Sequence, residues 1–324
     1  MQWDMRSRLA VTFCVGILLA LAGTAAWPQS GRTIRLILPF PPGGPADVMA
    51  RAVADQIGSS GGPTMVIESH PGAGTEIGTE YVSRSEPDGY TLGIVSNSFV
   101  VLPHMRKLNY DPLTDFVPIC ELASFPPLVV VNDDSPYRTF AELIDAAHKQ
   151  PGMLTYATIG PATASEMAFE KLKRAAKVNL TFVPFAGYTP AVQALLGKQV
   201  TVAQADLATL QGQIEAGKLR ALATLARKRV ASLPGVPTIA EAGYPDAEAE
   251  FFGGVVTPAK TPKQMIAELT GLFSAAIKAP KVEAKFTALG FFAGGECGAD
   301  FAAIIRKDDA DYGRIIHDAK VKTE

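Results

Sequence analysis

The chain has 324 residues, more than one ordinary hydrophobic core needs and enough for two α/β lobes. Apolar residues make up 48% and charged residues 19% of the sequence, which is typical of globular proteins and argues against disorder. The formal net charge is −2 and the chain carries no dense basic run, so nucleic acid is not an expected partner.

The N-terminal segment has the pattern of a secretory signal peptide. Arg6 and Arg8 form a short basic start, an apolar run covers 11–22, and small residues follow at 23–26. The apolar run is shorter than the ~20 residues that an ordinary membrane-spanning helix needs. We expect a cleaved leader, 1–26, and export of the mature chain; the alternative is an uncleaved N-terminal anchor.

Beyond the leader, the chain alternates short β-branched runs with helical patterns. The first elements, strand and helix in turn, are expected at 34–38, 47–57, 65–67, 76–84 and 91–95. After a proline-rich joint, the alternation restarts at 128–131 (strand) and 139–148 (helix), with further strands near 154–157, 180–183, 200–203 and 219–224. A second Pro- and Gly-rich connector precedes a strand at 251–257 and two or three final helices, the last at about 300–317.

This alternation predicts an α/β fold in which each lobe is a mainly parallel sheet flanked by helices. Two crossings would divide the chain into a discontinuous first lobe, 27–124 plus 252–324, and a second lobe, 125–251. Two lobes joined by two crossings can open and close around a ligand by hinge motion.

Two cysteines, Cys120 and Cys297, remain after the leader is removed, in an oxidising compartment. They could form a disulfide, or they could be buried thiols that pack as small hydrophobic side chains. Because sequence spacing does not place their Cα atoms within bridging distance, two buried thiols are the favoured interpretation.

Two glycine-rich loops follow expected strands, where ligands bind in open α/β sheets. The loop 39–47 lets backbone amides approach an anion at a helix start, and Asp47 would cap that helix or brace the loop; a rigid turn without a ligand is the alternative. The loop 70–78 contains G-x-G-x-x-x-G, a weak and irregular dinucleotide signal. An amide-lined turn directed at a carboxylate fits that loop better.

A third loop, 158–165, opens a helix of the second lobe. Thr163 and Ser165 offer hydroxyl donors there, and either could simply cap the helix. The sequence has no P-loop, H-E-x-x-H or C-x-x-C signature, and its four histidines lie far apart. We therefore expect a binding protein with no cofactor, metal or catalytic residue; an exported hydrolase or a dinucleotide enzyme is the weaker alternative.

Several motifs, in one order along nearly all of the mature chain, resemble the Bug/TctC-type substrate-binding proteins of tripartite tricarboxylate transporters. They are IRLILPFPPGGPADVMAR, PGAGTEIG, EPDGYTL, YDPLTDFVPI, VPFAGYTPAVQALLGKQV, AGKLRALAT, LPGVPTIAEAGYP and TPAKTPKQM. The resemblance implies a type II-like, two-lobe periplasmic binding protein that delivers a small carboxylate to integral-membrane transporter subunits. A ligand sensor that feeds a signalling kinase is the alternative, and we expect a monomer.

The resemblance also implies where the ligand binds. Backbone amides and ordered waters of the first lobe would hold a carboxylate, with the candidates Phe40, Pro41, Gly43, Gly44, Ala46, Asp47, Ala73, Gly74, Ser96 and Asn97. Hydroxyls and amides of the second lobe would hold the far end, with the candidates Thr163, Ser165, Phe185, Gly187, Tyr188 and Asp206.

The chain departs from the family pattern at charged positions. Family members often carry an Arg where His70 stands, a His where Glu166 stands and a Lys where Ala186 stands. Asp206 adds a further acid, so each difference lowers the positive charge near the site. Because facing carboxylates repel and an unpaired buried one is costly, we expect a ligand with one carboxylate at the first lobe and a neutral or cationic far end.

Overall fold

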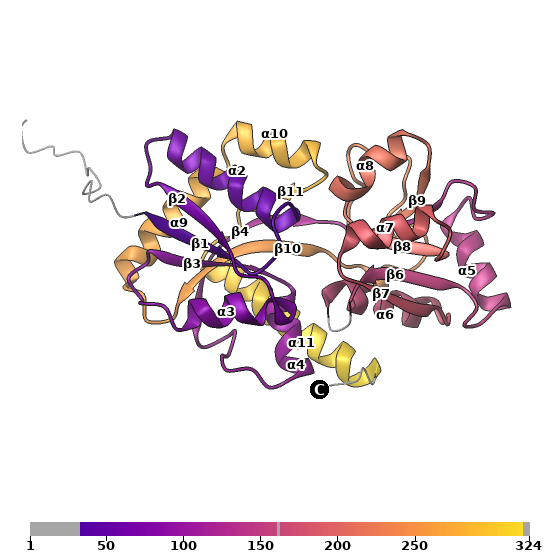
Figure 1. The fold of residues 1–324 in the computed structure, drawn as a ribbon, viewed down its shortest axis with the longest axis horizontal. Coiled ribbons are helices and arrows are strands. Elements are labelled where there is room, and N and C mark those ends of the chain that lie inside the picture. The colour runs from indigo at the N-terminus through magenta and orange to yellow at the C-terminus, as the bar shows by residue number, and fades with distance from the viewer. Residues whose placement is uncertain (1–32, 161–162, 320–324) are drawn as a thin grey trace, which may run out of the picture. The chain divides into compact units, whose positions relative to one another are not determined.

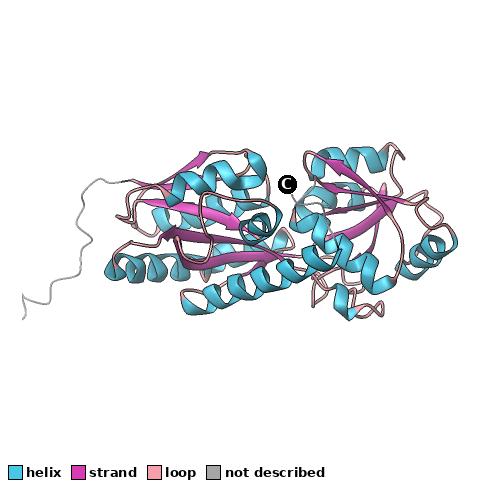
Figure 2. Ribbon diagram, turned by 90° about the horizontal axis from the view of Figure 1, so that it is seen from below, coloured by secondary structure: helices cyan, strands magenta, loops and turns pink. Residues whose placement is uncertain are grey.

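The computed structural model describes residues 33–160 and 163–319, so the expected leader lies outside the described residues. The strands form two separate sheets, and helices flank each of them (Figures 1 and 2). The first has the strand order β11-β4-β10-β3-β1-β2 and the second β7-β6-β8-β5-β9. Within the described residues, no helix is long and apolar enough to span a bilayer.

The strands of the first sheet come from both ends of the described chain. They are β1 (Ile34–Leu38), β2 (Met65–Ser69), β3 (Thr91–Ser96), β4 (Phe116–Phe125), β10 (Phe251–Pro258) and β11 (Phe292–Ala293). The helices in the same parts of the chain are α2 (Pro45–Ser59), α3 (Glu76–Ser83), α4 (Ser98–Met105), α9 (Lys263–Ile277), α10 (Pro280–Ala288) and α11 (Ala299–Ala319).

The second sheet uses one continuous middle segment. Its strands are β5 (Leu128–Asn132), β6 (Thr155–Ile159), β7 (Thr181–Phe185), β8 (Val202–Ala205) and β9 (Leu219–Thr224). The helices here are α5 (Phe140–Lys149), α6 (Ala164–Ala176), α7 (Tyr188–Leu196) and α8 (Leu207–Glu215). The chain passes from one sheet to the other twice, between β4 and β5 and between β9 and β10. The residue boundaries expected for the two lobes stay a prediction.

The expectation of mainly parallel sheets is wrong, because both sheets are mixed. β1 pairs in parallel with β2 and β3, and β6 with β7 and β8, as the β-helix-β alternation predicts. However, β10 runs antiparallel to β3 and β4, and β5 antiparallel to β8 and β9. These strands adjoin the crossings, and a strand that continues from the other sheet needs no helical crossover to pair with its neighbours.

Aromatic side chains pack together in the hydrophobic cores of both parts of the fold. In the second sheet, the ring of Tyr156 is stacked 4.2 Å from that of Phe169 on α6 and 5.0 Å from that of Phe182 on β7. At the crossings, Phe125 and Phe251 are register partners whose rings meet edge to face at 5.7 Å. Such pairs contribute beyond their buried area, so the two crossing segments are held firmly together.

The interpretation of Cys120 and Cys297 as free thiols is also wrong, because the two form a disulfide. The segment that contains Cys297 runs antiparallel beside β4: the amide of Glu121 donates to the carbonyl of Glu296 at 2.8 Å, and that of Gly298 to Ile119 at 2.8 Å. The two cysteines are therefore directly opposite each other. Nothing in the spacing of residues 177 positions apart could reveal this pairing.

Candidate functional site

The first candidate loop links β1 to α2 and is braced by a buried carboxylate. Asp47, 4% exposed, accepts a hydrogen bond through Oδ2 from the amide of Gly43 at 2.8 Å. Its Oδ1 lies 2.8 Å from Nε of Arg51. Gly44 is the N-cap of α2 without a side-chain cap, so of the two roles expected for Asp47 the structure shows loop bracing. Gly43 itself has φ +88°, a conformation that glycine adopts without strain.

The other candidates of this loop lie around the braced turn. Pro41 is exposed, and Phe40 and Ala46 are half-buried. The carbonyl of Phe40 accepts a hydrogen bond from the Ser69 hydroxyl at 2.7 Å, which ties this loop to the end of β2. The first two candidate loops are thus linked at their bases.

The second candidate loop contains three consecutive left-handed residues, Ala73, Gly74 and Thr75, with φ of 45°, 63° and 96°. Arg106 holds the turn, because its guanidinium donates to the Ala73 carbonyl and lies 2.9 Å from Glu76 Oε2. Ala73 and Gly74 are exposed. Left-handed conformations cost about 1–3 kcal/mol at residues other than glycine, and such strain concentrates at ligand-binding sites.

Thr75 is a candidate that sequence reasoning missed. Its side chain is 7% exposed, and among the described residues its Oγ1 has no hydrogen-bond partner, although buried hydroxyls are normally paired. A threonine in a glycine-rich turn gives no sequence signal of its backbone strain, which only the φ of 96° reveals.

Replacing Thr75 by glycine is expected to relieve this strain. The free energy of unfolding of the variant Thr75→Gly should rise by about 1 kcal/mol, the lower end of the cost of a strained residue. Urea denaturation measures this, with Thr75→Ala as the control, since alanine also lacks the hydroxyl but keeps a Cβ at the positive φ and so should not gain stability. A Thr75→Gly variant less stable than the parent would contradict the strain assigned to this residue.

The end of β3 supplies Ser96 and Asn97, which the structure places in different roles. Ser96 Oγ accepts from the amide of Ser98 at 3.3 Å. Asn97 is 1% exposed; its Nδ2 donates to Asp308 Oδ2 at 2.9 Å and its Oδ1 accepts from the Phe252 amide at 3.0 Å. The Asn97 side chain therefore ties β3 to β10 and α11, a role that sequence reasoning did not anticipate.

In the second sheet, three helix N-termini meet at one edge. β6, β7 and β8 are parallel neighbours, and each is followed by a helix, so the N-caps of α6, α7 and α8 gather at the carboxyl ends of these strands. The caps are Thr163, Gly187 and Asp206, all of them predicted site residues. Unpaired amides and the partial positive charge of a helix start suit an oxygen-rich ligand.

Hydroxyl groups line the same edge. Thr163 Oγ1 accepts from the Glu166 amide at 3.3 Å and donates towards the Gly160 carbonyl at 3.0 Å, so its expected capping role is confirmed. The hydroxyls of Ser165 and Tyr188 lie 2.8 Å apart, joining the first turns of α6 and α7. Burial raises the pKa of Tyr188, which keeps its hydroxyl protonated.

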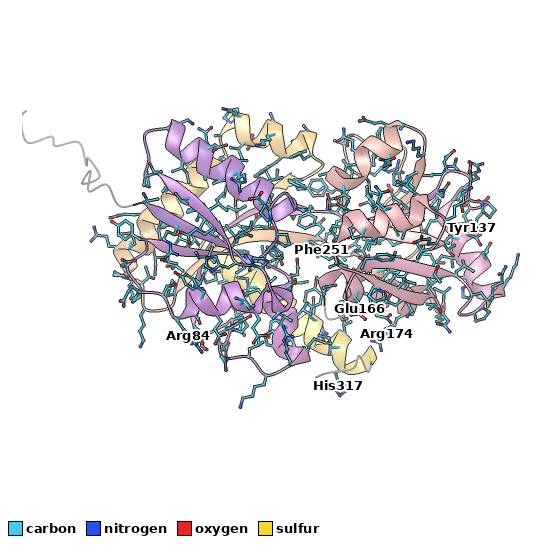
Figure 3. All side chains as sticks on the ribbon, in the orientation of Figure 1. Arg84, Tyr137, Glu166, Arg174, Phe251 and His317 are labelled. Atoms are coloured by element: carbon cyan, nitrogen blue, oxygen red, sulfur yellow. A yellow bond between two sulfur atoms is a disulfide. The ribbon has the colours of Figure 1, made fainter. Side chains whose placement is uncertain are left out.

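Acidic groups at this edge are buried. Asp206 is 1% exposed, accepts from the Thr209 amide at 3.0 Å and from its hydroxyl at 2.9 Å, and has a pKa raised by burial. Glu166, on the first turn of α6, is 9% exposed (Figure 3). Neither side chain points into bulk water. Phe185, the last residue of β7, is half-buried, and its carbonyl accepts a hydrogen bond from the amide of Gly160 at 2.8 Å.

His70 also has partners that explain its position. Its Nε2 lies 3.5 Å from Glu68 Oε2, and its ring centroid lies 4.8 Å from that of Tyr81. Arg35 binds the same Glu68 through two hydrogen bonds of 2.6 and 2.7 Å. His70 therefore belongs to a side-chain cluster next to the second candidate loop.

One short segment matches the sequence motif of a catalytic serine but does not have the backbone structure that the motif requires. Residues 58–62 read G-S-S-G-G, which fits G-x-S-x-G, but Ser60 is the C-cap of α2. A nucleophile elbow places its serine on a turn from a strand into a helix. The run is thus a helix end rather than an elbow.

Comparison with known proteins places the chain in a family. A family model described as "Tripartite tricarboxylate transporter family receptor" matches residues 49–321. The chain belongs to this receptor family. A curated relative, Protein BugT of Bordetella pertussis, is 35% identical over 297 residues, which are 89% of each chain.

Solved structures of similar receptors share the fold. One, described as a periplasmic transporter, is 33% identical with a TM-score of 0.84 and covers 92% of this chain and 100% of its own. Rpa4515 of R. palustris, solved with adipate, is 28% identical with a TM-score of 0.84 over the same shares. The predicted family and two-lobe periplasmic binding fold are confirmed, and these relatives indicate a periplasmic protein.

Proposed function

We propose that this receptor captures a small carboxylate-bearing solute and delivers it, chemically unchanged, to the membrane subunits of a tripartite tricarboxylate-type transporter. The observation that carries the proposal is the shared geometry of the two sheets. In each, three parallel strands end at one edge, and the loops and helix starts beyond them present backbone amides and hydroxyls. Such edges are where α/β proteins bind ligands. The adipate bound to Rpa4515 supports a carboxylate as the ligand class.

The first-sheet loops would hold the ligand carboxylate. The loop 39–47 leads into the start of α2, and the turn at Ala73 and Gly74 leads into α3. Both starts carry partial positive charge, and glycine lets main-chain amides approach closely. Pre-formed strain at Thr75 and the brace from Asp47 would hold these amides in place before the ligand arrives, which reduces the entropic cost of binding.

The second-sheet edge would hold the rest of the molecule. It offers the hydroxyls of Ser165 and Tyr188. Glu166 follows Ser165 directly and Asp206 caps α8 at the same edge, and both acidic side chains are buried. A second ligand carboxylate at this edge would meet acidic groups in a poorly solvated place, which is unfavourable. We therefore expect a ligand whose far end is neutral or cationic, unlike the dicarboxylate adipate.

A thermal-shift panel on the mature chain, 27–324, tests this function. The panel contains monocarboxylates, amino acids, dicarboxylates, tricarboxylates and uncharged analogues of equal size. A ligand that binds only the folded state should add about 2.7 kcal/mol of stability at a hundred times its Kd. We expect this for a compound with one carboxylate and not for its amide analogue. A response to uncharged analogues alone would contradict the proposal, and the strongest response to citrate would contradict the expected ligand charge.

A further inference from the structure

A cavity of about 770 Å³ lies beside the crossings and is separate from the proposed carboxylate site. Its walls come from β4, β10 and β11, from α6 and α11, and from the segment 245–250 that leads into β10. None of its described lining residues is one of the candidates for the carboxylate site. We call it the crossing cavity. Its volume is in the range of pockets that enclose small molecules.

Acidic side chains dominate the lining of the crossing cavity. They are Glu121, Asp246, Glu248, Glu250, Glu296, Asp308 and Asp311. The basic side chains are Lys171, Arg227, Lys228 and Lys307. The lining thus has a net negative charge, and this charge attracts cations.

Three of the four basic side chains of the lining form hydrogen bonds or ion pairs with acidic residues of the same lining. Lys171 donates to the main-chain carbonyl of Glu248 at 2.6 Å, and Arg227 Nε lies 3.5 Å from a carboxylate oxygen of the same residue. Lys307 pairs with Asp311 at 2.9 Å. The excess negative charge therefore lies with the remaining acids.

Glu121 is a buried acid of this lining. Its side chain is 7% exposed, and its carboxyl interacts with that of Glu296. Within residues 33–160 and 163–319, no cationic side chain pairs with it. Burial and the negative charges of Glu296, Glu250 and Asp308 raise the pKa of Glu121 to about 8. A buried carboxyl without a cation is costly to ionise, and a bound cation would remove that cost.

Aromatic side chains complete the walls. Phe251, Phe252, Phe292 and Tyr312 line the crossing cavity together with its acids. Aromatic faces attract organic cations, whereas a small metal ion is bound mainly by oxygen ligands at close range. Carboxyl groups and aromatic side chains that line one cavity of molecular size therefore match an alkylammonium ion.

We propose that the crossing cavity is a second binding site, for a small organic amine in its ammonium form, with Glu121 as its principal counter-ion. Aliphatic methylenes of the amine pack against the rings, and ammonium hydrogens reach the carboxylates of Glu121 and Glu296. The lining of the crossing cavity comes from β4 and α11 as well as from α6, so an occupant contacts parts of the chain that belong to different sheets.

Binding is coupled to protons at this site. The groups that face Glu121 are Glu296, Glu250 and Asp308, and the cations of the lining are those on α6 and α11 and in the segment 227–228. Since Glu121 holds its proton below a pH of about 8, an ammonium ion must displace that proton in order to bind. The affinity for the amine therefore rises with pH towards 8, and binding releases a proton.

Isothermal titration of the mature chain with 1,4-diaminobutane, at constant ionic strength, tests the proposal. We expect saturable binding that is about tenfold or more weaker in Glu121→Gln, since a hydrogen bond to a charged group is lost. Asp308→Asn is the second variant if Glu121→Gln fails to fold. The control Asp246→Asn, an exposed acid of the same lining, should bind as the parent does. Titration in two buffers of different ionisation enthalpy should show proton release.

Three results would overturn the proposal. They are no saturable binding at pH 8, equal binding by the parent and both acid variants, and binding of calcium chloride with an affinity equal to that of the amine in the same titration. The Glu121→Gln arm separates this proposal from the proposed function, because Glu121 is not a candidate of the carboxylate site. Asp308 accepts a hydrogen bond from the candidate Asn97, so the carboxylate affinity of Asp308→Asn is measured as well.

Discussion

Replacing both Cys120 and Cys297 by alanine is expected to lower the free energy of unfolding by about 2–5 kcal/mol. The bond joins β4 to the segment before α11 and closes a loop spanning 177 residues of sequence. Without it, the unfolded chain gains the conformational freedom that this closure removes, and the segment beside β4 keeps only its main-chain hydrogen bonds. Urea denaturation of the mature chain measures the change.

Reduced wild-type protein is the matched control for the disulfide prediction, because it loses the bond and keeps both sulfur atoms. We expect its urea midpoint to fall close to that of the double variant. Equal midpoints for the oxidised parent and the double variant would show that the disulfide adds no stability.

The variant Asp47→Ala is expected to weaken carboxylate binding about 10- to 100-fold, since hydrogen bonds to charged groups are worth about 1.5–3 kcal/mol. In the parent, Asp47 accepts from the Gly43 amide and holds Arg51, so the loop that precedes α2 is fixed. Alanine leaves the loop free to move, and the ligand must then order it on binding. Titration with the carboxylate that gives the largest thermal shift measures the loss.

Asp55→Ala is the control for this prediction. Asp55 is an exposed acid on the same helix, and its substitution removes the same charge without touching the loop. Its affinity should match that of the parent. If Asp47→Ala lowers stability without changing affinity, the braced loop does not contribute to the carboxylate site.

The parts of this molecule that depend on local sequence were predictable. Short apolar runs predicted β1, β3, β5 and β9 almost to the residue, because most residues of these runs are buried in the sheets. The glycine-rich loops were recognised because glycine tolerates the positive φ of tight turns, and Gly43 has φ +88°. The hydroxyl cap at Thr163 followed from the preference of helix starts for threonine.

Features that depend on distant pairing were not predictable. The antiparallel course of β10 depends on which strands flank it after the chain returns from the second sheet. The contact of Asn97 with Asp308 joins residues 211 positions apart, and the disulfide joins residues 177 apart. β4 was missed because Pro118 and Glu121 interrupt its apolar pattern.

A crystal structure of the mature protein with the best carboxylate from the panel would show where the ligand binds. We expect the ligand carboxylate within hydrogen-bonding distance of main-chain amides of the loops at 39–47 and 73–75, directly or through one water. We expect the far end of the ligand beside Ser165 and Tyr188. A carboxylate bound away from both first-sheet loops would show that the proposed site is wrong.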